Sequence, residues 1–232
     1  MNTYSIAGLS VNMECSGRSE IQAQKYLVGF TENPDITILS NPRYVKALHE
    51  KHPHLTEDEC LYIYLCKNLS SALLDYDGFV LHSSAVCYEN KAYLFSADSG
   101  TGKSTHTALW TKIFDGAEII NDDKPAIRII DGKFYVCGTP FSGSSPLNKN
   151  VCVPLQAICF IERGQKNEIE HIYDNANIIY SILSQTLRKN GTDKTIKLMM
   201  LLDKLLKDIP IYRLKCLPNE DAAILAHKVM SK

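Results

Sequence analysis

Apolar and polar residues follow one another along the chain in blocks of two kinds, some with the period of a strand and others with that of a helix. Residues 3–15 alternate and contain β-branched side chains, so we predict a strand there. From there to about residue 55 the pattern is weak and predicts little. Residues 56–78 repeat leucines at helical spacing, with Thr56 and Glu59 in capping-box register and Gly78 placed to end the helix.

The middle of the chain alternates short apolar runs with turn residues, a pattern typical of antiparallel hairpins. Residues 79–88 and 92–97 form one predicted hairpin around 89–91. Further predicted elements are a helix at 103–114, a strand at 117–123, a hairpin at 126–138 around Asp131-Gly132, a strand at 155–162, helices at 175–191 (ended by Gly191) and 193–208, a strand at 209–217 and a helix at 219–230. The many hairpins predict an α+β fold with mixed, largely antiparallel sheets and flanking helices.

Composition and charge exclude several classes of protein. The 232 residues are 45% hydrophobic and 22% charged, which are ordinary globular values and fit one large domain, with or without a small appendage. A net charge of −1 creates no field that would attract nucleic acid or an anionic membrane, so we expect neither as a partner. The N-terminus lacks the basic and apolar regions of a signal peptide, and no apolar run could span a bilayer, so we expect a cytoplasmic protein.

The cysteines and a group of histidines predict no metal site. None of the eight cysteines forms a C-x-x-C pair, and most have apolar neighbours, so we expect reduced, buried thiols. The spacing of His49, His52 and His54 matches no common ligand pattern. We interpret these histidines as a solvated helix end followed by a turn at Pro53.

Residues 97–104, Ala-Asp-Ser-Gly-Thr-Gly-Lys-Ser, fit the phosphate-binding P-loop pattern between a predicted strand and a predicted helix. Small residues at Gly100 and Gly102 allow backbone N–H groups to surround phosphate oxygens. Lys103 can reach the β- and γ-phosphates, Ser104 can coordinate Mg²⁺, and the helix directs its positive end at the triphosphate. The alternative is a glycine turn with an incidental lysine. The pattern predicts ATP and Mg²⁺ as ligands, bound by Ser99, Gly100, Thr101, Gly102, Lys103, Ser104 and Thr105.

Two adjacent acids follow the strand predicted after the P-loop helix. Asp122 and Asp123 could bind Mg²⁺ and accept a proton from an incoming hydroxyl, or they could belong to a solvated turn before Pro125. His82 precedes the P-loop strand and could be a hydrogen-bonded core residue or a site residue.

Several further residues are weaker candidates. Residues 138–150 are rich in small polar side chains and could form a substrate loop or a plain connector. Lys124, Arg128 and Lys149 are the nearest cations that could stabilise a transferred phosphoryl group, and nothing local ranks them or separates them from surface charges.

The combination of "HSSAV", "SGTGKST", "NDD" and "GTPFSG" resembles the HPr kinase and phosphoenolpyruvate carboxykinase superfamily, and most of all its small HPr-kinase-like members. The flanking segments "YSIAGLSV", "LLDYDGFVLH" and "IPIYRLKCLPNEDAA" extend the resemblance over nearly the whole chain. It implies a P-loop on a mixed-sheet fold and a single kinase domain over residues 1–232, with residues 1–76 as an appendage packed on its core.

The same resemblance implies roles for individual residues. Lys103 would bind the β- and γ-phosphates, and Ser104 would hold Mg²⁺ with Asp123 nearby. Asp122 matches the base that deprotonates a serine hydroxyl, and His82 matches a histidine near the active site. Thr105 departs from the family, because HPr kinases carry Glu there, and this puts HPr itself as the substrate in doubt.

The function expected from these residues is an ATP-dependent kinase that phosphorylates a hydroxyl, most simply a serine, in a peptide, protein or small metabolite. A non-catalytic ATP-binding sensor is the alternative, although intact acids beside an intact lysine favour catalysis. A carboxykinase-like lyase is a third interpretation, against which the chain length argues. The expected partners are ATP and the hydroxyl acceptor, and a homo-oligomer is compatible with the sequence.

Overall fold

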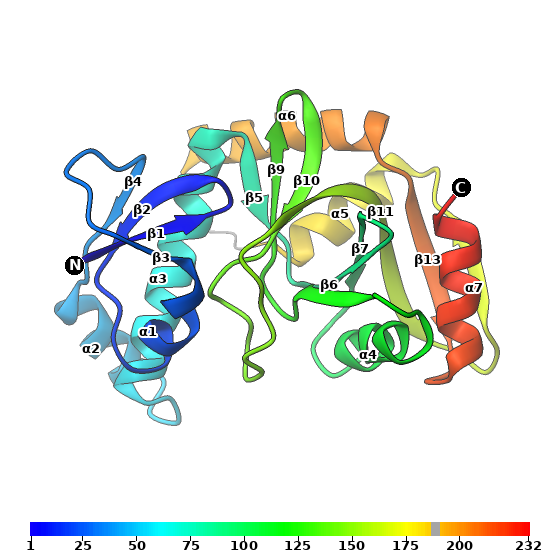
Figure 1. Cartoon of the computed structure of the whole chain (residues 1–232), viewed down its shortest axis with the longest axis horizontal. Helices are drawn as coiled ribbons and strands as arrows, with labels where there is room; N and C mark the ends of the chain where they lie inside the picture. Colours follow the sequence, from blue (N-terminus) through cyan, green and yellow to red (C-terminus); the bar gives the residue numbers. More distant parts are fainter. Residues whose placement is uncertain (187–190) are drawn as a thin grey trace.

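The computed structural model describes residues 1–186 and 191–232. In these residues the chain forms two sheets and seven helices, and its termini lie at opposite ends of the longest axis (Figure 1). None of the described helices combines the length and the apolar composition that crossing a bilayer requires.

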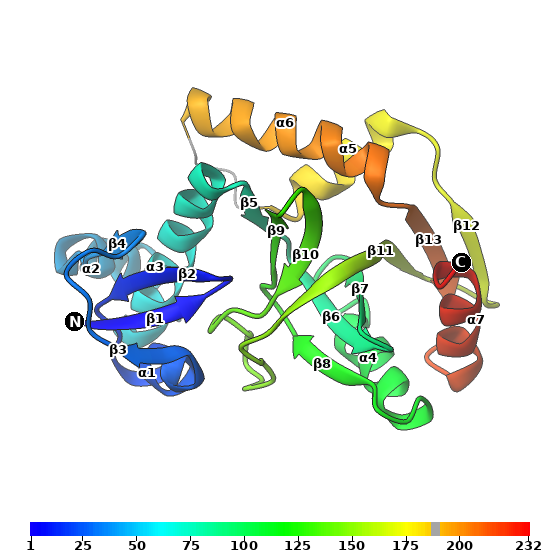
Figure 2. The same cartoon turned by 45° about the horizontal axis from the view of Figure 1, so that its top comes forward.

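The N-terminal part is a small sheet that packs on one long helix (Figure 2). Its strand order is β3-β1-β2-β4, in which only the β2–β4 pair is parallel. The elements are β1 (Asn2–Ile6), β2 (Leu9–Met13), α1 (Gly17–Ala23), β3 (Leu27–Gly29), β4 (Ile36–Ile38), α2 (Pro42–Lys51) and α3 (Glu57–Leu73), with 3₁₀ turns at Gln24–Tyr26 and Leu74–Tyr76.

The larger sheet has nine strands in the described residues, in the order β5-β9-β10-β11-β7-β6-β8, with β13 added to β11 and β12 to β13. The strands are β5 (Gly78–Val80), β6 (Ser83–Tyr88), β7 (Lys91–Ser96), β8 (Glu118–Asn121), β9 (Ala126–Ile130), β10 (Lys133–Cys137), β11 (Cys152–Arg163), β12 (Glu168–His171) and β13 (Ile211–Cys216). Strand β11 pairs in parallel with β7 and β13, and the other pairs are antiparallel. The predicted mixed, largely antiparallel α+β fold is confirmed.

Helices cover both faces of this sheet around β7. Ala92 and Leu94 contact the side of α5 (Asn175–Ser184) and α6 (Thr192–Asp208). Tyr93 and Phe95 face the opposite side, where Trp110 and Met230 lie on α4 (Lys103–Ile113) and α7 (Glu220–Met230). A strand that is buried on both faces has no polar alternation, which is why residues 92–95 of β7 are all apolar or aromatic.

One of the buried clusters joins the two sheets. Tyr26 and Leu65 of the N-terminal part belong to the same buried cluster as Val80, Ala126 and Phe141 of the larger sheet region. Residues 1–76 are therefore packed on the rest of the chain, whereas the single kinase domain over 1–232 stays a prediction.

Turn chemistry accounts for the predictions that are confirmed. Glu89-Asn90 and Asp131-Gly132 join antiparallel strands, and all four residues have positive φ angles, as a type I′ turn requires. At the start of α3 the Thr56 hydroxyl accepts a hydrogen bond from the Glu59 amide at 3.2 Å, and the Glu59 carboxylate accepts one from the Thr56 amide at 2.8 Å. The capping box is confirmed.

Four boundary predictions are wrong. The single strand predicted at 79–88 is two strands, because the chain is interrupted after Val80: β5 pairs with β9, whereas β6 pairs with β7 and β8. The strand predicted at 3–15 is the β1–β2 hairpin, because Ala7 and Gly8 turn the chain with φ angles of 53° and 76°. The left-handed residue after α3 is Asp77, with φ 52°, and Gly78 already belongs to β5. Helix α5 ends at Ser184, and Gly191 precedes α6 as its N-cap; residues 187–190, inside the helix predicted at 175–191, lie outside the described residues.

The expectation that all thiols are reduced is also wrong. Cys137 and Cys152 face each other in the β10–β11 register and form a disulfide. The free cysteines are Cys15, Cys60, Cys66, Cys87, Cys159 and Cys216, of which Cys60, Cys66 and Cys159 are buried.

In the histidine group, α2 ends at Lys51, His52 is its C-cap and His49 Nδ1 lies 2.6 Å from the Leu55 carbonyl oxygen.

Candidate functional site

The glycine-rich turn joins the buried strand β7 to helix α4. Gly100 and Gly102 have φ angles of 77° and 124°, a backbone conformation that strongly favours glycine, and no atom crowds the position where either would carry a Cβ. Gly102 is the N-cap of α4, and no side chain accepts a hydrogen bond from the first amides of this 11-residue helix. The first turn of α4 therefore presents uncapped N–H groups, the donors that an anion needs.

Lys103 lies beneath this turn with 7% of its surface exposed. Its Nζ donates to the carbonyl oxygens of Ala97 at 2.9 Å and Asp98 at 3.2 Å. Burial lowers the pKa of Lys103, an effect that the neighbouring acid Asp123 opposes. The side chain holds the turn closed, and its charge lies at the base of the turn.

Asp122 and Asp123 follow strand β8 in a turn that Asn121 shapes. The buried Asn121 side chain accepts hydrogen bonds from the amides of Asp123 at 2.9 Å and Lys124 at 2.7 Å. Its own amide donates to the Thr139 carbonyl oxygen at 2.9 Å. Asn121 therefore satisfies the backbone of the turn from which both carboxylates reach the cavity.

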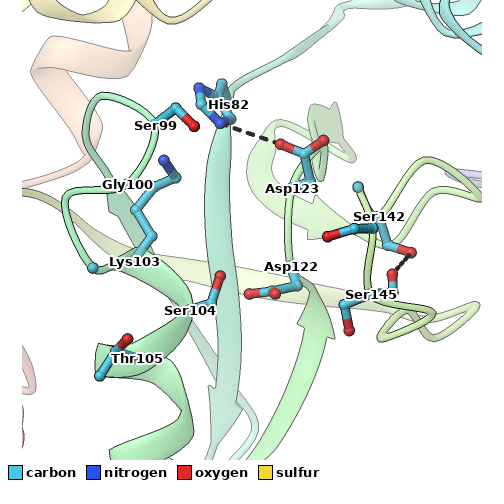
Figure 3. A pocket seen from close by; sticks show the side chains of 13 residues that line it. His82, Ser99, Gly100, Lys103, Ser104, Thr105, Asp122, Asp123, Ser142 and Ser145 are labelled. Carbon is cyan, nitrogen blue, oxygen red and sulfur yellow. Dashed lines mark hydrogen bonds and ion pairs between the residues drawn. The ribbon is translucent and has the colours of Figure 1, made fainter. Parts of the chain in front are cut away.

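The turn and the acids line one cavity, whose volume is about 400 Å³. Figure 3 shows the side chains around it. Its lining residues are His82, Ser99, Gly100, Gly102, Lys103, Ser104, Thr105, Asp122, Asp123, Ser142, Gly143, Ser144 and Ser145. Of the residues predicted from the sequence to bind nucleotide, metal or acceptor, only Thr101 is not among them; it lines the hollow on the other side of the turn. The geometry brings the predicted residues together, and their roles stay predictions.

The two acids have different surroundings. Asp123 Oδ1 lies 3.2 Å from His82 Nε2 and 2.7 Å from Lys124 Nζ. Burial raises the pKa of Asp123, but the His82 hydrogen bond and the Lys124 charge outweigh burial, so that its pKa lies below the ordinary value. Asp122 Oδ1 instead accepts a hydrogen bond from the Ser84 hydroxyl at 2.6 Å. Asp123 is therefore a charge-paired anion, and Asp122 contacts a neutral donor.

His82 belongs to a hydrogen-bonded chain that crosses to the glycine-rich turn. Its Nδ1 lies 2.8 Å from Gln185 Oε1, and Gln185 Nε2 donates to Asp98 Oδ1 at 2.8 Å. The chain thus connects Asp98, before the turn, with Asp123. Gln185 follows helix α5, more than a hundred residues after His82. No local sequence signal marks it, because only the tertiary fold brings it to the site.

Residues 142–145 form the far wall of the cavity, and helix α1 and the 3₁₀ turn that follows it hold the surrounding segment in place. Gln22 Nε2 donates to the Gly143 carbonyl oxygen at 3.3 Å, and Lys25 Nζ donates to the carbonyl oxygen of Asn148 at 2.9 Å. Gly143 packs so closely on Asp123 that a Cβ would lie 3.1 Å from that side chain. Residues 142–145 of the predicted loop at 138–150 line the cavity, and a role of this loop in binding substrate stays a prediction.

The candidate cations divide between the site and the surface. Lys124 contacts Asp123, whereas Arg128 donates to the backbone carbonyls of Tyr76 and Ala7, and Lys149 pairs with Glu118 at 2.6 Å. No sequence pattern marks Arg163, which lies at the end of β11 and donates to the Gly100 carbonyl oxygen at 2.7 Å.

A second hollow of about 410 Å³ lies on the other side of the glycine-rich turn. It shares Gly100, Gly102 and Thr105 with the first cavity, but its walls are more apolar. Its other lining residues are Thr101, His106, Leu109, Ile161, Glu162, Arg163, Gly164, Cys216, Leu217 and Pro218. The turn therefore separates a polar cavity from a largely apolar one.

Oxygen ligands are present for a hard cation. The Ser104 hydroxyl and the carboxylates of Asp122 and Asp123 line one cavity, and Mg²⁺ prefers such ligands. Among the described residues, no group of three or more His, Cys, Asp or Glu side chains is placed to hold a metal alone. This donor set fits an ion that arrives with phosphate oxygens, because Mg²⁺ is usually bound by one or two carboxylates plus substrate phosphates.

Comparisons with known proteins give only distant structural similarity. No family model matches the chain, and no curated protein matches it. Among solved structures, the HPr(Ser) kinase/phosphatase from Coxiella burnetii is similar over 66% of this chain and 88% of its own, with 9% identity and a TM-score of 0.40. At this distance the similarity assigns neither a family nor a function.

Proposed function

We propose that this protein is an ATP-dependent phosphotransferase that phosphorylates a hydroxyl group. The observation that supports the proposal is one cavity lined by the glycine-rich turn, Lys103, Ser104 and the two acids. Segments 99–105 and 122–123 come from different elements and meet only in the fold. A phosphate cradle beside paired carboxylates is the arrangement that phosphoryl transfer to a hydroxyl requires.

In this proposal the triphosphate binds at the first turn of α4. The uncapped N–H groups and the helix dipole attract the phosphates, and Lys103 adds a positive charge beneath them. The purine base occupies the second hollow, where Leu109, Ile161 and Leu217 supply apolar contacts. A nucleotide placed this way spans the turn and directs its γ-phosphate at the acids.

Asp122 is the proposed general base. The acceptor oxygen attacks the γ-phosphorus, the bond from that phosphorus to the β,γ-bridging oxygen breaks, and ADP leaves with the bond's electron pair. Asp122 takes the proton of the acceptor hydroxyl. Ser104 and Asp123 would hold Mg²⁺, which neutralises charge on the phosphate oxygens when it is bound.

The alternative is the non-catalytic ATP sensor, and one experiment separates the two. The protein is incubated with [γ-³²P]ATP and Mg²⁺ in two separate reactions. One contains a small-molecule extract of the source organism, and the other contains a protein extract. We expect label on a new small molecule or protein, and no transfer with Lys103→Ala. Binding of ATP without label on either extract would contradict the phosphotransferase and favour the sensor.

A further inference from the structure

A buried hydroxyl contacts the proposed base directly. Ser84, on strand β6, is 0% exposed, and its Oγ donates to Asp122 Oδ1 at 2.6 Å. The same Oγ lies 2.7 Å from Oγ1 of Thr107, which is also 0% exposed and belongs to helix α4. A line of two hydroxyls therefore joins the helix that follows the glycine-rich turn to the acid across the cavity.

The charge of Asp122 determines the direction of these hydrogen bonds. An ionised carboxylate can only accept, so the single proton of Ser84 is donated to Asp122. The Ser84–Thr107 contact must then use the proton of Thr107. Thr107 Oγ1 also lies 3.3 Å from the carbonyl oxygens of Lys103 and Ser104, which are longer contacts for the same proton.

We propose that Ser84 and Thr107 are positioning residues for Asp122. The hydrogen bond from Ser84, whose hydroxyl Thr107 orients, occupies Oδ1 and fixes the carboxylate rotation, which leaves Oδ2 to receive the proton of the acceptor hydroxyl. Thr107 lies one helical turn after Lys103, so these hydrogen bonds fix the position of Asp122 relative to the helix that binds the phosphates. The inference rests on the proposed function, since it assumes that Asp122 is the base.

The neighbouring Ser83 provides a matched control. It is also 0% exposed, but its hydroxyl donates to the Leu81 carbonyl oxygen at 3.1 Å. Ser83→Ala and Ser84→Ala each remove one buried hydroxyl from adjacent positions of one strand. A purely structural role predicts similar consequences, whereas a positioning role predicts different ones.

The first test needs neither nucleotide nor acceptor. The side-chain carboxyl ¹³C resonance of Asp122, assigned by its loss in Asp122→Asn, is compared among variants at one pH. We expect it to shift in Ser84→Ala and to stay in place in Ser83→Ala. An unchanged resonance in folded Ser84→Ala, or equal shifts in both variants, would overturn the proposal.

The second test is the rate of label transfer at saturating ATP. Because Ser84→Ala loses a hydrogen bond to a charged group, we expect its transfer rate to be lower by about tenfold. Thr107→Val, which keeps the shape without the hydroxyl, should also be slow, and Thr107→Ser should restore most of the rate. ATP affinity should stay near wild type in all of them. Equal rates in Ser84→Ala and Ser83→Ala would overturn the proposal, whereas absence of transfer by the wild type would contradict the proposed function and leave the resonance test to decide.

Discussion

At the scale of single residues, Lys103 combines burial with charge. Its two hydrogen bonds to loop carbonyls hold the turn closed, and its ammonium group lies where phosphate charge would gather. We expect Lys103→Ala to weaken Mg–ATP binding by about 10- to 100-fold, the value of hydrogen bonds to a charged group. Isothermal titration measures this, with Lys149→Ala as the control because Lys149 pairs with Glu118 instead. Equal affinity in wild type and Lys103→Ala would contradict the phosphate cradle.

The chemistry of the site could be predicted from the sequence only where it is local. The glycine-rich turn and the Asp122-Asp123 pair are continuous segments whose residue types carry their own signal. Ser84 and Gln185 carry none, because a serine on an apolar strand and a glutamine after a helix are ordinary. The β6–β8 register, which pairs Ala85 with Asn121, brings Ser84 to Asp122.

At the scale of elements, helix α1 has the clearest consequence for the site. Gln22, which is 6% exposed, accepts a hydrogen bond from Tyr62 at 3.0 Å and donates one to the Gly143 carbonyl oxygen at 3.3 Å. We expect Gln22→Leu to release residues 142–147, with amide hydrogen exchange faster by about tenfold for the loss of one to two hydrogen bonds. Ile21→Ala, at a 74% exposed position of the same helix, should leave exchange unchanged. Unchanged exchange in Gln22→Leu would show that α1 does not hold the loop.

The elements that the sequence predicts well are those with strong turn or cap chemistry. Asp131-Gly132 and the Thr56–Glu59 box determine backbone conformation locally, and both are confirmed. Helix α1 and strands β3 and β4 are short, and tertiary contacts rather than an apolar period stabilise them. That is why residues 16–40 could not be predicted.

At the scale of the whole molecule, we expect the free energy of unfolding to decrease in acid because His106 is buried. This side chain is 4% exposed, accepts a hydrogen bond from Trp110 Nε1 at 3.2 Å, and burial lowers its pKa to about 4. In the unfolded chain the pKa of this histidine is about 6.5. Between about pH 6.5 and pH 4 the unfolded chain binds a proton that the folded chain does not bind, so stability decreases as the pH falls through this range. The full loss is about 3 kcal/mol. It is measured by urea unfolding across this range.

His106→Gln provides the comparison, because carboxylates also titrate in acid. Glutamine retains an acceptor for Trp110 and cannot bind the proton. The variant should therefore lose less stability over the same pH range than the wild type. Parallel curves for the two proteins would mean that folding does not lower the pKa of His106.

The proposed phosphoryl transfer depends on Asp122 acting as a base. The rate of single-turnover transfer from [γ-³²P]ATP to the acceptor that the extract experiment identifies is measured at saturating Mg–ATP for wild type and Asp122→Asn. Isothermal titration measures the ATP affinity of both proteins. The amide keeps the shape of the carboxylate but cannot accept the proton, so we expect transfer to fall by about 10²- to 10⁴-fold while ATP affinity stays close to wild type. Transfer by Asp122→Asn at the wild-type rate would contradict the proposed mechanism.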